Sequence, residues 1–110
     1  MRGRPATDVL ALPLRLHGIE LGRPTDALVE PESGRILGFE VVCGDFVQRF
    51  VPFSVVEIRP DEIALGSALT LIDDRNLDFY RRRSRPLGEL GYVEPWLDES
   101  GVIHEARSAA

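Results

Sequence analysis

No helical period of apolar residues extends through the chain before residue 72; the apolar residues fall in short segments separated by glycine and proline. The clearest segment covers residues 35–43, where strand alternation assigns one face to Leu37, Phe39, Val41 and Cys43. Between segments, proline presets the φ of a turn and glycine permits positive φ. We therefore predict six short strands, at residues 12–17, 25–30, 35–43, 46–51, 55–59 and 62–65.

Six short strands joined by tight turns predict an all-β meander. Gly44 and Asp45 are expected to form a two-residue hairpin loop between the third and fourth strands. Closing the meander into a small six-stranded antiparallel barrel would remove the unpaired edges that invite aggregation. We assign this barrel to residues 13–72 and treat residues 1–12 as an N-terminal tail.

The character of the sequence changes in a C-terminal extension, residues 73–110. A short helix is predicted at residues 74–83, because acidic residues at its start and arginines at its end suit the helix dipole. Residues 87–106 form a hairpin or partial repeat: like residues 21–36, they run from Leu-Gly to an acidic-Ser-Gly turn. A partial repeat cannot close a barrel alone, so it docks either on the first barrel or on a second subunit.

Size and composition restrict the class of protein. The 110 residues suffice for one domain, and 44% hydrophobic residues suit a globular core. The single cysteine, Cys43, excludes an intrachain disulfide, and we expect a small buried hydrophobe rather than a nucleophile. The longest stretch with few charges, residues 9–16, is about half as long as a membrane span. No signal peptide is recognisable, so we expect a soluble, cytoplasmic protein without membrane insertion.

Charge argues against general nucleic-acid binding. The 13 basic residues are all arginine, but 18 acidic residues give a net charge of −5, whereas nucleic-acid binding needs a net basic face. One local cluster departs from this balance and supplies candidate binding residues: Arg81, Arg82, Arg83 and Arg85. These arginines could hold phosphate, RNA or an acidic partner; alternatively, they form a solvated helix end or offset the acidic C-terminal residues.

Two blocks of motifs follow one another in residues 21–65. The first opens on Leu-Gly and contains Glu-Pro-Glu-Ser-Gly at residues 30–34; the second contains Val-Pro-Phe-Ser at residues 51–54 and a last hairpin. This order resembles the PRC-barrel family, which includes the cytoplasmic domain of the photosynthetic reaction-centre H subunit and the C-terminal domain of a bacterial ribosome-maturation factor. The resemblance covers about half the chain. It implies a six-stranded barrel that serves as a binding or structural module, with no family catalytic residues to carry over.

No catalytic or metal-binding constellation is recognisable in the sequence. His17 and His104 are isolated, and the acidic residues at 73, 74 and 78 lack the glycine of a calcium loop. Neither a nucleophile elbow nor a phosphate-binding loop is present. We therefore expect a non-enzymatic protein without a cofactor or metal.

Three residues near the C-terminus are candidate dimer-interface anchors: Tyr92, Trp96 and Leu97. In an extended segment Tyr92 and Trp96 share a face, and both residue types are favoured at interfaces. Because the partial repeat cannot bury its own face, we predict a homodimer. The expected function is a protein-interaction or small-ligand-binding module; the alternative is a ribosome- or RNA-associated accessory protein that uses the arginine cluster.

Overall fold

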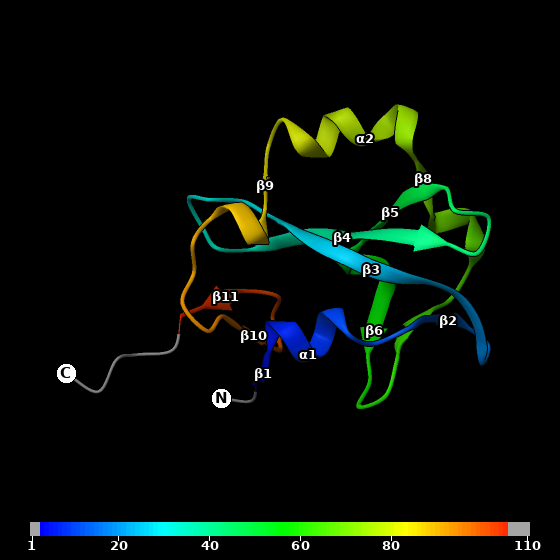
Figure 1. Ribbon diagram of the computed structural model, residues 1–110, viewed down its shortest axis with the longest axis horizontal. Helices are drawn as coiled ribbons and strands as arrows, with labels where there is room; N and C mark the ends of the chain where they lie inside the picture. The colour runs from blue at the N-terminus through cyan, green and yellow to red at the C-terminus, as the bar shows by residue number, and fades with distance from the viewer. Residues whose placement is uncertain (1–2, 106–110) are drawn as a thin grey trace.

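Strands make up close to half of the chain, and short helices connect or flank them (Figure 1). The computed structural model describes residues 3–105, with every side chain in that range except those of residues 68 and 73–76. The helical segments are α1 (Ala6–Leu10), η1 (Phe53–Val55), η2 (Ala68–Thr70), α2 (Asp74–Arg81) and η3 (Leu87–Glu89). The strands are β1 (Gly3–Pro5), β2 (Leu14–Leu16), β3 (Ile19–Val29), β4 (Ile36–Cys43), β5 (Gln48–Pro52), β6 (Val56–Ile58), β7 (Ile63–Leu65), β8 (Ile72–Asp73), β9 (Arg85–Pro86), β10 (Trp96–Asp98) and β11 (Ile103–His104).

Eight of these strands form one curled, mixed sheet in the order β6-β7-β2-β3-β4-β5-β8, with β9 added beside β3. The long strand β3 pairs with β2 near its start and with β9 near its end. Neighbouring strands run antiparallel except β2 and β7, which are parallel. The prediction of a mostly β protein is therefore confirmed in this coarser form.

The curled sheet is a half-barrel, and the predicted closed antiparallel barrel is not what the structure shows. The outer edge of β5 pairs with β8, where Phe50 lies opposite Ile72, so β6 cannot pair there. The outer edge of β6 faces α1 and β10 instead (Figure 1). The barrel does not close because β8 pairs with the outer edge of β5, while the outer edge of β6 pairs with no strand of the described residues and lies across a gap from α1 and β10.

Both faces of β4 are buried. Phe39, Val41 and Cys43 point into the main core on the concave side, as the alternation predicts. The Leu37 side chain points to the opposite face of the sheet. The reason is a β-bulge at Leu37, where the register between β3 and β4 shifts. Leu37 packs instead in a second cluster under α2, with Leu28, Phe50 and Leu77.

Residues 3–12, which the sequence suggests as a tail, contribute to the main core. Ala6 and Val9 lie three residues apart in α1 and are 3% and 1% exposed. The Ala6 amide donates a hydrogen bond to the Pro95 carbonyl at 2.9 Å, which anchors the start of the helix. Its apolar face covers part of the open side of the half-barrel (Figure 1).

The C-terminal hairpin docks on its own chain, in a small sheet of order β1-β10-β11. The Ile36 amide donates to the Gly101 carbonyl at 2.8 Å, and the Ile103 amide donates to the Gly34 carbonyl at 2.7 Å. Gly34 corresponds to Gly101 in the sequence echo, and Ile36 corresponds to Ile103, so this contact is approximately two-fold symmetric. The partial repeat thus covers its apolar face within one chain.

Candidate functional site

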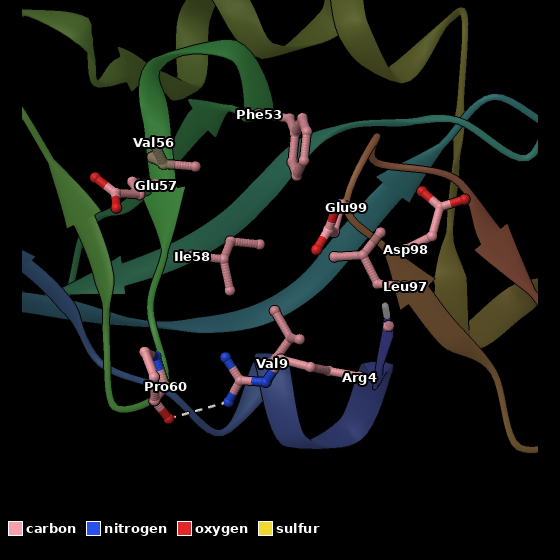
Figure 2. Close-up of a pocket in the computed structure, with 11 residues that line it drawn as sticks. Arg4, Val9, Phe53, Val56, Glu57, Ile58, Pro60, Leu97, Asp98 and Glu99 are labelled. Carbon is pink, nitrogen blue, oxygen red and sulfur yellow. Dashed lines mark hydrogen bonds between the residues drawn. The ribbon is translucent and has the colours of Figure 1, made fainter. Parts of the chain in front are cut away.

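An open cleft lies between the outer edge of β6 and strand β10 (Figure 2). Its volume is about 900 Å³, which is within the range of small-molecule sites. Figure 2 shows apolar side chains entering it from opposite walls, with Val56 and Ile58 on β6 facing Leu97 on β10. Val9 of α1 and Phe53 of η1 complete the apolar lining. The cleft therefore lies along the outer edge of β6, one of the two edges that a closed barrel would have joined.

The position of Phe53 depends on two special residues. Pro52 ends β5, since proline has no amide hydrogen for a ladder, and the chain turns there into η1. The Phe53 ring then packs against Gly101, where an added Cβ would lie 2.6 Å from a ring carbon. Gly101 also has a φ of +86°, which favours glycine independently.

Arg4 links the two walls at one end of the cleft. Its Nη1 donates a hydrogen bond to the Arg59 carbonyl at 2.6 Å. Its Nη2 donates a hydrogen bond to the Pro60 carbonyl at 3.1 Å (Figure 2). The partners lie in the turn that follows β6, whereas Arg4 lies in β1. These hydrogen bonds tie β1 to the turn that follows β6.

Three carboxylates border the cleft, and only that of Glu99 points into it. Glu57 on β6 turns away from the cleft and accepts a hydrogen bond from Arg59 at 3.4 Å, while Glu99 points inward from the opposite wall (Figure 2). Together with Arg4 and Asp98, the charged lining residues sum to a formal −2 at pH 7. Because Glu57 and Asp98 turn away from the cleft, this sum describes the rim of the cleft rather than its interior.

Asp98 organises the turn between β10 and β11. Its Oδ1 accepts hydrogen bonds from the Ser100 amide at 2.9 Å, the Ser100 hydroxyl at 2.8 Å and the Val102 amide at 3.0 Å. Its Oδ2 lies 2.7 Å from Nε2 of His104. Burial alone raises the pKa of this carboxyl, but the bonds from His104, Val102 and Ser100 outweigh burial and hold the pKa well below its usual range.

The pairing of His104 with Asp98 is a feature that sequence reasoning missed. The available signal was the predicted hairpin, which places the two residues on neighbouring strands. The Asp98 carboxylate turns toward β11, away from the cleft (Figure 2). The Ser100 hydroxyl bonds to Asp98 rather than to the histidine, so these side chains do not form the relay that activates a serine.

Two of the four candidate arginines contact other side chains of the same chain. Arg81 places its Nε 3.6 Å from the buried carboxylate of Glu40, and the Arg83 guanidinium lies over the Phe79 ring, 5.4 Å from its centroid. Arg85 belongs to β9, where it pairs with Val29, and Arg82 is exposed. At least two of the four therefore stabilise the chain's own helix and sheet.

The three candidate interface residues pack within the chain. Leu97 is 5% exposed in the main core, and Tyr92 packs against that core. Trp96 stacks on the His104 ring, with the two centroids 4.4 Å apart, and it also covers Gly3. The surface that motivated the predicted dimer is thus largely covered by residues of the same chain.

Three further observations concern metal binding, membrane helices and similarity to known proteins. Among the described His, Cys, Asp and Glu side chains, no group of three lies close enough to hold a metal ion. No helix within residues 3–105 has the length and apolar character needed to cross a membrane. Searched against models of known protein families and against curated proteins, the chain matches none of them.

Proposed function

We propose that this chain is a non-enzymatic binding module that holds an apolar group of a partner in the cleft beside β6. The observation that carries the proposal is the cleft itself, whose apolar lining combines side chains of α1, η1, β6 and β10. Val56 and Ile58 remain partly exposed there, whereas their partners on β7, Leu65 and Ile63, are buried. An apolar group that covered them would gain about 25 cal/mol for each Å² removed from water.

Membership of the PRC-barrel family is part of this proposal. Its support is the order of elements: six strands, β2 to β7, follow one another in residues 14–65 with the turn at residues 31–34 between β3 and β4. A cytoplasmic location is also proposed. Cys43 is buried and unpaired, as is typical of proteins from reducing compartments.

The proposal is tested with N-phenyl-1-naphthylamine, a neutral apolar dye whose fluorescence rises in apolar sites. The full chain should bind the dye saturably. Val56→Trp, which fills the cleft, should abolish the signal, whereas Val93→Trp makes the same change at an exposed residue outside the lining and should preserve it. Equal binding by both variants, or no binding by the unmodified chain, would contradict the proposal.

The homodimer remains a prediction, with different support. Tyr92, Trp96 and Leu97 pack within the chain, so an interface would use other apolar side chains that are exposed, chiefly Phe46 and Leu69 at 90% and 95%. Such residues contribute to association where they gather in one patch. Light scattering at tens of micromolar should give twice the 12.3 kDa mass of the chain; a monomer mass would refute the dimer.

A further inference from the structure

The hairpin of β6 and β7 shows which backbone groups of β6 are free. The Arg59 amide donates to the Glu62 carbonyl at 2.8 Å, so these two residues form a hydrogen-bonded pair. Hydrogen-bonded and non-hydrogen-bonded pairs alternate along an antiparallel ladder. Ile58, opposite Ile63, is therefore in a non-hydrogen-bonded pair, and its amide and carbonyl point to the outer edge. The Ile63 amide is consistent with this alternation, because it points away from β6 and donates a hydrogen bond to the Pro13 carbonyl.

The outer edge of β6 has backbone groups available for another strand. β6 is the terminal strand of the large sheet. The Val56 amide is bonded to the Phe53 carbonyl. Among the described residues, however, no hydrogen bond engages the Ile58 amide, the Ile58 carbonyl or the Val56 carbonyl. The Arg4 side chain bonds only the carbonyls of the following turn. This edge therefore lies along the cleft with one amide and two carbonyls that are not bonded within the described residues.

Side-chain direction defines what an added strand would need. Val56 and Ile58 point into the cleft, and Glu57 between them points away from it (Figure 2). Residues directly opposite each other on paired strands share a face. A strand added to β6 would therefore place apolar residues opposite Val56 and Ile58, and the residue between them beside Glu57. An arginine or lysine suits that intermediate position.

We propose that an extended peptide segment of a partner protein, with alternating apolar and basic residues, adds antiparallel to β6 and inserts its apolar side chains into the cleft. This inference rests on the proposed function and specifies its occupant. The free backbone edge favours an extended chain over a compact ligand. The basic residue of the segment would lie on the face from which Glu57 projects, so its charge complements this exposed carboxylate.

The probe for this proposal is the peptide acetyl-Val-Arg-Val-Arg-Val-amide, titrated into the ¹⁵N-labelled full chain. In the proposed geometry the valines lie opposite Val56 and Ile58 and form the hydrogen-bonded pairs, so the valine amides bond to β6 and the arginine amides face away. N-methylation of the central valine should therefore abolish binding, whereas N-methylation of an arginine should preserve it. Peptide binding should shift the Ile58 amide resonance most strongly.

Charge reversal supplies the second arm of the test. Replacing arginine by glutamate in the peptide should weaken binding about tenfold, and Glu57→Arg in the protein should reverse that preference. Glu89→Arg, an exposed change outside the lining, should leave the preference unaltered. No saturable binding of the Val-Arg peptide, or equal binding of both N-methylated forms, would overturn strand addition. If the neutral dye still binds in that case, the proposed function stands without it; loss of both signals would refute both.

Discussion

Asp98 supports one wall of the cleft, and its replacement should have a large, pH-dependent effect on stability. The side chain is 8% exposed and accepts three hydrogen bonds on one oxygen. Asp98→Ala leaves the Ser100 and Val102 amides without this acceptor, and we expect a loss of about 3–4 kcal/mol in the free energy of unfolding. Asp98→Asn keeps a carbonyl oxygen in the turn but removes the charge, so about 1–2 kcal/mol is expected.

The pH dependence follows from the lowered pKa of Asp98. In the unfolded chain this carboxyl has its ordinary pKa of 3.8, and in the folded chain the pKa is lower. Its ionised form therefore contributes stability that is fully present above about pH 5 and lost as pH falls below 3.8 toward the folded pKa. The difference between the unmodified chain and Asp98→Asn should accordingly shrink on acidification.

Urea unfolding followed by circular dichroism, at pH 7 and at pH 3, measures this effect. Glu99→Gln is the control, because it changes the exposed neighbouring carboxylate and should shift stability by less than about 0.5 kcal/mol. If Asp98→Asn matched the unmodified chain at pH 7, or if its deficit were the same at both pH values, the assigned role of the carboxylate would be refuted.

Four further predictions concern the packing at Gly38, the Arg4 side chain that links the cleft walls, the Cys43 thiol and nucleic-acid binding. Gly38→Ala should lower the free energy of unfolding by about 1–3 kcal/mol in urea titrations, since its Cβ would collide with the Val51 carbonyl oxygen; an unchanged midpoint would contradict this packing. Arg4→Ala should raise the dissociation constant of the neutral dye, because the walls lose their link at one end; unchanged affinity would argue against that role. Native Cys43 should resist iodoacetamide for hours by mass spectrometry and react within minutes in urea, because it is buried. A gel-shift assay at low salt should show no binding of a short RNA, given the net charge of −5.

Local patterns in the sequence predicted the parts of the fold that depend on local physics. The alternation in residues 35–43 identified β4, and the turn at residues 31–34 separates β3 from β4 as expected. The bulge that turns Leu37 to the other face was not predictable, because it depends on the register with β3. The loop after β4 is also longer than predicted: β5 begins only at Gln48, and Phe46 adopts a φ of +64° there.

The cleft itself was beyond prediction from the sequence. Its walls combine residues from β1, α1, η1, β6 and β10, which no single pattern connects. Two of these elements lie in residues 3–10, where five helical residues are too few to show a periodicity. The sequence echo between residues 21–36 and 87–103 contained relevant information, because its two turns meet in the structure. Whether residues 87–103 dock on their own barrel or on a second subunit depends on tertiary contacts, which the sequence pattern does not show.

Amide hydrogen exchange of β6 in the free protein tests most directly whether the half-barrel is open beside the cleft. We predict that exchange alternates along the strand: the Glu57 amide, bonded to β7, should exchange slowly, while the Ile58 amide should exchange nearly as fast as an unstructured amide. Adding the Val-Arg peptide should then slow exchange at Ile58. Slow exchange at Ile58 in the free chain would mean that another strand already pairs there, and would contradict an open edge at β6.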